Sequence, residues 1–180
     1  MEEFQRFTAS DAAALEAGIR DHRDKLAAAV RAGTAAAIIE HAADLGTLLI
    51  TARRETEALQ VLQEQLTLAG ALPELEATGW FWNAYATALQ YLDRRDEADS
   101  VFAKALALTR EGGWRRLQSF VLQHRGRSQV EQGRWQDAEA SFCEALHLRQ
   151  QLNDPLQAST QRALDGLMQR RKSRPGEGAA

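Results

Sequence analysis

The feature that most constrains the fold is an internal repeat with a step of 40 residues. Alanine, large apolar and small residues each recur at this step, in a single register. The rows are Ala58, Ala98 and Ala138; Leu62, Phe102 and Phe142; Leu66, Leu106 and Leu146; Leu68, Leu108 and Leu148; and Gly46, Ala86, Gly126 and Gly166. Repeats of a few tens of residues mark arrays in which each unit buries its apolar face against its neighbours. We therefore interpret the chain as a tandem array.

Each repeat carries the pattern of two helices. Apolar residues recur at spacings of three and four, as in Trp82, Tyr85, Ala86 and Leu89, which places them on one face of a helix. The chain has three prolines and is rich in strong helix formers. The sequence therefore predicts an all-α protein.

The middle repeat shows an aromatic, small-residue and aromatic order, in Trp82-x-x-Tyr85-Ala86-x-x-Leu89 followed by Ala98-x-x-x-Phe102-x-x-Ala105-Leu106. This order resembles the tetratricopeptide repeat (TPR). The step of 40 residues is longer than the usual step of about 34, and the closing proline is missing. Such lengthened repeats are similar to those of kinesin light chains and of bacterial regulatory TPR proteins. The resemblance implies an α-solenoid of three TPR-like helix-turn-helix units with a capping helix at each end.

The predicted boundaries follow from the repeat. We expect an N-terminal capping helix within residues 1–34, with Asp11 as a cap, and three repeats at about 35–74, 75–114 and 115–154. Asp154-Pro155 is a helix-start signal, which predicts a C-terminal capping helix at 155–172. Residues 173–180 are expected to be a disordered tail. Gln65 replaces a small residue of the repeat pattern and weakens the match locally.

Charge and composition exclude several functional classes. The net charge is −3, from 22 basic and 25 acidic residues, which argues against a nucleic-acid partner. No apolar run approaches the roughly 20 residues of a membrane helix, and the first residues do not resemble a secretory signal. We therefore expect a cytoplasmic protein without a membrane partner.

No catalytic or metal motif is found. The histidines His22, His41, His124 and His147 are never three or four residues apart, so no single helix presents a histidine pair. The single cysteine, Cys143, is expected to pack as a small apolar side chain beside Phe142. We expect no enzymatic activity, no cofactor and no metal.

The run Trp80-Phe81-Trp82 cannot lie on one helix face, because successive helical residues are about 100° apart. Trp82 matches the core aromatic residue of the repeat. Trp80 or Phe81 then packs against the preceding repeat or the loop around Leu72, or serves as an aromatic anchor for a partner.

The TPR resemblance also implies a concave groove lined by the first helix of each repeat. The polar residues that it places there are Thr47, Asn83, Thr87, Gln90, Tyr91, Gln123 and Arg127. Only Asn83 and Arg127 could help to bind a carboxylate, so a clamp for chaperone C-termini is not expected. A neutral, amide-rich groove suits the backbone of a bound peptide or helix, with Arg127 as the single charged anchor.

The sequence thus predicts a non-catalytic protein-interaction module that docks a peptide or helix of a partner protein. The alternatives are a self-associating structural module, which would form a homodimer, and a dedicated secretion chaperone or regulatory peptide sensor.

Overall fold

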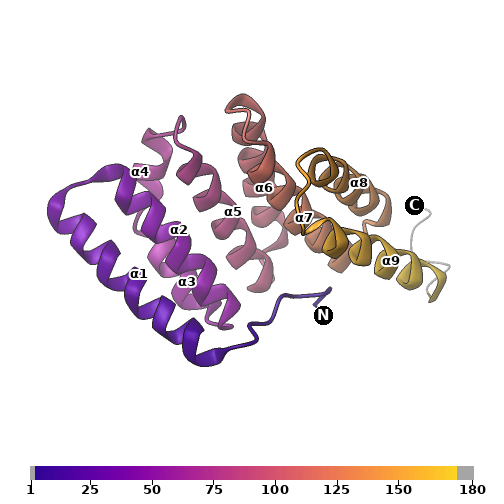
Figure 1. Cartoon of the computed structure of the whole chain (residues 1–180), viewed down its shortest axis with the longest axis horizontal. Helices are drawn as coiled ribbons and strands as arrows, with labels where there is room; N and C mark the ends of the chain where they lie inside the picture. Colours follow the sequence, from indigo (N-terminus) through magenta and orange to yellow (C-terminus); the bar gives the residue numbers. More distant parts are fainter. Residues whose placement is uncertain (1–2, 174–180) are drawn as a thin grey trace. The chain divides into compact units, whose positions relative to one another are not determined.

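The computed structural model describes residues 3–173, and within this range the chain forms nine α-helices and no strand (Figure 1). The all-α prediction is confirmed. The helices fall into two compact units. Residues 7–112 form the first, here called the α1–α6 unit; residues 3–6 together with 113–173 form the second, called the α7–α9 unit. The predicted tail from 174 onward lies outside the described residues, and Ser173 still belongs to the last helix.

The α1–α6 unit is built from helix pairs. Helix α1 (Ala12–Ala32) packs along α2 (Ala35–Thr51), which packs against α3 (Glu55–Gln63) and α5 (Glu76–Tyr91) (Figure 1). Helix α5 pairs with α6 (Arg95–Glu111). The core side chains come from the rows predicted by the repeat and from their neighbours on α2 and α5, with Leu45, Leu49, Leu62, Phe81 and Phe102 fully buried.

The turn between the paired helices repeats at the same step of 40 residues. Arg53, Asp93 and Gly133 all have positive φ, at 60°, 60° and 74°. Each is followed by an arginine that forms an ion pair with the acidic residue three positions later: Arg54–Glu57 at 2.6 Å, Arg94–Glu97 at 2.7 Å and Arg134–Asp137 at 2.7 Å. The left-handed residue ends the first helix, and the ion pair lies in the first turn of the second.

The second helix of the first repeat differs from the prediction, because it is broken. It ends at Gln63 and resumes as the short helix α4 (Leu66–Ala71). Gln65 lies in the break with φ of −108°. Its equivalents in the other repeats, Ala105 and Ala145, are completely buried. A long polar side chain cannot take that buried position without losing its hydrogen bonds to water, and the helix is interrupted there.

The α7–α9 unit contains α7 (Arg115–Glu131), α8 (Trp135–Gln151) and α9 (Gln157–Ser173). Helix α8 packs against both of the others. Helix α9 as assigned begins at Gln157, after a turn over Pro155 and Leu156. Asp154 Oδ1 accepts a hydrogen bond from the backbone N–H of Leu156 at 2.8 Å, which is the contact expected of a capping aspartate followed by proline.

Residues 3–6 were expected to belong to an N-terminal capping domain, but they pack in the α7–α9 unit. The capping helix itself, α1, begins at Ala12, where Asp11 accepts a hydrogen bond from the backbone N–H of Ala14 at 2.9 Å. None of the helices within residues 3–173 is long and apolar enough to cross a membrane.

Candidate functional site

The polar residues predicted for the groove lie on the first helices of the repeats, and most are buried. Thr47 on α2 is exposed, and Tyr91 at the end of α5 is half-buried. The others have at most 9 % of their surface exposed: Asn83, Thr87 and Gln90 on α5, and Gln123 and Arg127 on α7. The set is divided between the two compact units. Contact of these residues with a partner stays a prediction.

Several of these side chains serve the packing of their own helices. Thr87 Oγ1 donates a hydrogen bond to the backbone carbonyl of Asn83 at 2.7 Å, and Thr47 Oγ1 does the same to Ala43 at 2.9 Å. The Gln123 side-chain oxygen accepts from Arg149 at 3.4 Å. Asn83 Oδ1 and Gln123 Nε2 are buried with no hydrogen-bond partner among the described residues. Helix α5 therefore carries a hydrogen-bond acceptor, and α7 a hydrogen-bond donor, that could each bind a further group.

Arg149, at the end of α8, joins all three helices of its unit and was not anticipated from the sequence. Its guanidinium donates to Gln123 on α7, to Thr160 on α9 and, at 3.2 Å, to the backbone carbonyl of Leu156. The Arg149 side chain is 2 % exposed, and burial lowers its pKa from 12.5 to about 10 although Asp154 acts in the opposite direction. A buried arginine is stable only when such partners satisfy its donors.

The aromatic run divides between core and surface. The Phe81 side chain is fully buried, stacks on Tyr85 with a centroid distance of 6.5 Å, and meets Trp82 edge-on at 5.3 Å. The ammonium of Lys104 lies 3.5 Å from the centroid of the Trp82 ring. Trp80 is partly exposed. Of the two anchor candidates, Trp80 and Phe81, only Trp80 presents side-chain surface.

The α7–α9 unit holds residues 3–6 as a bent segment against its helices, with Gln5 at a positive φ of 46°. Phe4 is 2 % exposed and shares a hydrophobic core with residues of α7, α8 and α9, namely Val130, Trp135, Ala138, Phe142, Ala163, Leu164 and Leu167. The Glu131 carboxylate accepts a hydrogen bond from the Phe4 backbone N–H at 2.9 Å. The Gln5 side-chain amide donates to the Arg162 carbonyl at 3.0 Å. The Arg170 guanidinium lies 5.0 Å from the Phe4 ring centroid. We call this site the Phe4 pocket.

The Phe4 pocket falls in the register of the repeat. In the first and third repeats, the small residue of the first helix faces the large residue of the second. A Cβ atom added to Gly46 would lie 2.9 Å from Leu62, and one added to Gly126 would lie 2.6 Å from Phe142. Gly166 on α9 is the next member of that row, and its Cβ would lie 2.4 Å from Gln5 Nε2 and 3.3 Å from the Phe4 ring. Phe4 thus takes the place that the second helix fills in the other repeats.

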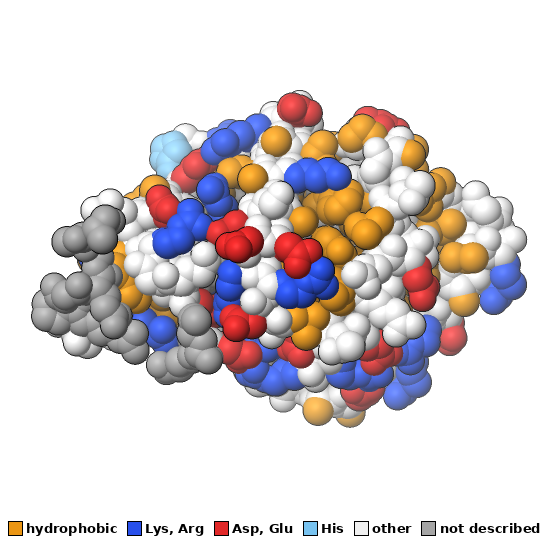
Figure 2. Space-filling model, turned by 180° about the vertical axis from the view of Figure 1, so that it is seen from behind, with side chains coloured by type: hydrophobic (Ala, Val, Ile, Leu, Met, Phe, Trp, Pro, Cys, Tyr) orange, Lys and Arg blue, Asp and Glu red, His pale blue; other side chains and the backbone are white. Residues whose placement is uncertain are grey.

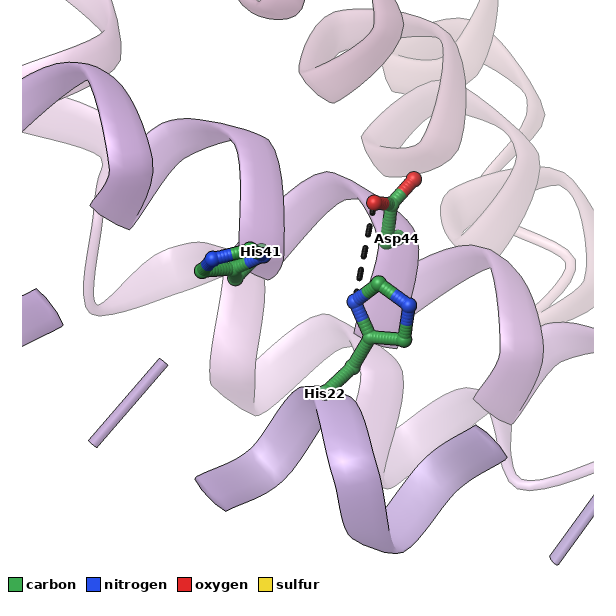
Figure 3. Close-up of side chains that lie close together, drawn as sticks. All are labelled: His22, His41 and Asp44. Atoms are coloured by element: carbon green, nitrogen blue, oxygen red, sulfur yellow. Dashed lines mark ion pairs between the residues drawn. The ribbon is translucent and has the colours of Figure 1, made fainter. Parts of the chain in front are cut away.

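Histidines that are far apart in the sequence meet in the α1–α6 unit. His22 on α1 lies beside His41 and Asp44 on α2 (Figure 3). Potential ligand atoms of the three side chains all lie within 4.8 Å of one another, and His22 Nδ1 is 3.5 Å from Asp44 Oδ2. Burial raises the pKa of Asp44, against the opposing charge of His22. The spacing of three between His41 and Asp44 is the sequence signal, but the partner His22 lies on another helix.

Charge and thiol chemistry add little to the site. On the face shown in Figure 2, basic and acidic side chains are intermixed. Cys143 is exposed, so the expectation that it packs in the core beside Phe142 is wrong. The helix turns Phe142 inward at this position, and the next residue therefore points outward.

The comparisons with known proteins support the fold. No protein-family model and no curated protein matches the sequence. The crystal structure of BtubC (BKLC) from P. vanneervenii, a kinesin light chain-like TPR protein, is similar with a TM-score of 0.70. The match covers 91 % of this chain and 68 % of that chain, with 21 % identical residues. The chain therefore has a TPR-like helical repeat fold.

Proposed function

We propose that this chain is a non-catalytic protein-interaction module that binds a short peptide segment of a partner protein. The observation that carries the proposal is the Phe4 pocket, in which the short segment of residues 3–6 is held by α7, α8 and α9. The TPR-like fold supports it, because helical repeats present surfaces on which peptides and helices dock.

The contacts at the Phe4 pocket combine side-chain and backbone recognition. One aromatic ring enters the core, the Glu131 carboxylate binds the backbone N–H of the same residue, and a carbonyl of α9 accepts from the following side chain. The aromatic ring supplies apolar burial, and the polar contacts fix its orientation. The preferred ligand is therefore a short segment that turns after one aromatic residue, which is followed by a long polar side chain.

Residues 3–6 occupy this pocket as part of the same chain, which gives them an advantage over any separate ligand. A segment joined to its own site has an effective concentration on the order of millimolar. A partner segment must compete with residues 3–6 for the pocket, so these residues set the partner concentration that is needed for binding. Loss of the Phe4 side chain should lower the partner concentration that is needed.

The test uses a fluorescent peptide with the sequence of residues 3–8, titrated into the full chain. We expect weak or no binding to the wild type and at least tenfold tighter binding to the Phe4→Ala chain, because the substitution empties the pocket. A peptide with alanine in place of Phe4 should bind neither. Phe7→Ala is the matched control, since Phe7 is 64 % exposed and Phe4 is 2 % exposed.

The proposal fails if a folded Phe4→Ala chain binds the peptide no better than the wild type does. Circular dichroism establishes that the variant is helical. If that variant is unfolded, Gly166→Leu replaces it, because the added side chain would clash with Gln5 and crowd the Phe4 ring. In that case release of the segment is read from faster tryptic cleavage after Arg6, and a segment that stays protected contradicts the pocket.

Self-association is a second candidate, and the same segment favours it. If residues 3–6 of one copy fill the pocket of another, the contact becomes a domain swap between two chains. Light scattering at increasing concentration then shows a dimer that the Phe4→Ala substitution abolishes. A dimer that persists in the Phe4→Ala chain would use another surface.

The residues predicted for the groove define the alternative docking surface. Within the α1–α6 unit, Asn83 and Tyr91 would contact the backbone of a peptide or helix and Trp80 would serve as the aromatic anchor; within the α7–α9 unit, Gln123 and Arg127 would make such contacts. Asn83 Oδ1 and Gln123 Nε2 are the buried polar atoms that a ligand could satisfy. With an identified partner, Tyr91→Ala and Phe4→Ala distinguish the surfaces, because each removes one aromatic side chain from only one of them.

A further inference from the structure

We propose that His22, His41 and Asp44 form a zinc site that joins α1 to α2. The site lies wholly within the α1–α6 unit. It brings two imidazoles and one carboxylate together, with ligand atoms within 4.8 Å of one another (Figure 3). The inference is independent of the proposed function, since the Phe4 pocket lies in the other unit.

The two histidines have unused capacity to bind a cation. The Nδ1 atoms of His22 and His41 are shielded from solvent and make no hydrogen bond among the described residues; that of His22 faces Asp44 Oδ2 at 3.5 Å, and that of His41 has no ion-pair partner among them. The rings meet edge to face with a centroid distance of 5.7 Å. A buried nitrogen without a partner costs free energy that a bound cation would recover. Their neighbour Asp44 carries the negative charge that such a cation requires.

The surroundings favour a divalent cation. The carboxylates of Asp21 and Glu40 lie close enough to influence this cluster, and Lys25 is the opposing charge. Lys25 is already paired with Asp21, at 2.7 Å. A bound metal ion would keep the Asp44 carboxylate deprotonated.

The ligand set identifies the class of metal. Two imidazole nitrogens and one carboxylate suit zinc and other transition ions, whereas calcium and magnesium prefer oxygen ligands alone. Zinc in proteins is usually four-coordinate, with Zn–N and Zn–O distances near 2.0–2.2 Å. Three protein ligands leave the fourth position to water. The present separations require small side-chain rotations to reach those distances.

The position of the site suggests a structural role. Of the 21 residues of α1, only Ile19 and Ala29 are buried, and Leu15 and Leu26 are partly buried, so few of its side chains are fully enclosed. His22 lies between Ile19 and Ala29 in the sequence. A zinc ion bound by His22 on α1 and by His41 and Asp44 on α2 would crosslink the two helices and hold the capping helix in place.

The experiment is a calorimetric titration of the full chain with zinc sulfate alone, after dialysis against a chelator. We expect one equivalent per chain and a raised melting temperature. His22→Ala, His41→Ala and Asp44→Asn should each weaken binding at least tenfold. The controls are His147→Ala and Cys143→Ser, which remove exposed zinc ligands outside the cluster and should change neither stoichiometry nor affinity.

Three results would overturn the proposal: absence of saturable binding, binding that the cluster variants leave unchanged, or binding that either control abolishes. Because an alanine variant could be unfolded, the imidazole resonances of the wild-type chain provide a second measurement. Zinc should shift the ring signals of His22 and His41 and leave those of His147 in place. Unshifted His22 and His41 signals at saturating zinc contradict the site even if metal binds elsewhere.

Discussion

The ring of Phe142 on α8 lies against the backbone of Gly126 on α7, so closely that a Cβ atom on Gly126 would come within 2.6 Å of it. The aromatic ring occupies the space that a side chain would need. The contact explains why position 126 takes the smallest residue, as does position 46 opposite Leu62.

Gly126→Ala should therefore destabilise the fold by about 1–3 kcal/mol, because the buried Phe142 ring has little room to move. Urea unfolding measures the free energy. Gly70→Ala is the matched control, since Gly70 lies in helix α4 with no atom within 4 Å of an added Cβ. That change should be neutral or stabilising by up to about 1 kcal/mol. Equal destabilisation by both substitutions would contradict the steric account.

Arg149→Met should destabilise the chain by about 2–4 kcal/mol, because it leaves the acceptors of Gln123 and Thr160 without their charged donor inside the unit. Equilibrium unfolding followed by circular dichroism provides the measurement. The control Arg31→Met removes an exposed arginine at the end of α1 and should cost less than about 1 kcal/mol. If the Arg149→Met chain is as stable as the wild type, the hydrogen bonds of Arg149 make no net contribution to the free energy of unfolding.

The largely buried setting of His124 should make the folded chain less stable in acid. Burial and then the positive charges of Arg127 and Arg149 lower its pKa from 6.5 to about 3. The folded chain therefore keeps the ring neutral where the unfolded chain binds a proton, so the stabilisation is complete above pH 6.5 and decreases as the pH falls toward 3. Because His124 is partly exposed, we take the full shift as an upper limit. The free energy of unfolding should then fall by up to about 2 kcal/mol between about pH 8 and pH 5.

The measurement is the urea midpoint of the wild type and of His124→Gln at both pH values. The variant lacks the titrating ring, so its midpoint should change less with pH. His147→Gln, at an exposed position on α8, controls for removal of a histidine as such. If His124→Gln and the wild type lose the same stability in acid, other groups cause the pH dependence.

Phe81→Ala and Trp80→Ala should separate core from surface in the aromatic run. Phe81 is fully buried, so its truncation should cost about 3–5 kcal/mol of unfolding free energy. Trp80 is partly exposed, and its truncation should cost less. Thermal unfolding of the two variants gives the comparison. A larger cost for Trp80→Ala would reverse this assignment of core and surface.

The repeat allowed most of the fold to be predicted, because it sets both helix identity and register. The second helices begin at Glu55, Arg95 and Trp135, a step of 40 residues apart. The break after Gln63 was not predicted, although Gln65 had already been identified as a departure from the pattern. Whether such a residue is tolerated depends on how deeply its position is buried, which the pattern does not give.

The candidate sites were less accessible to sequence analysis. Gly166 continues the row of small residues, but the sequence offers no helix partner for it, and the partner proves to be Phe4. His22 and His41 lie on helices whose relative register depends on tertiary packing. The seven polar groove residues follow from the positions that the TPR pattern assigns to the groove. Pattern alone does not tell whether a side chain at the edge of a helix pair is exposed.

Phe4 and Glu131, which share a hydrogen bond, are separated by 127 residues in the sequence. During synthesis, Phe4 emerges long before α9 exists, and at 5–20 residues per second the wait for Gly166 is roughly 10–30 s. For the last part of that interval the α1–α6 unit has its full sequence available, whereas the α7–α9 unit still lacks its last helix, although Phe4 has long been made. The contacts of residues 4 and 5 with α9 thus form only after almost all of residues 3–173 have been synthesised, and such non-local contacts slow folding.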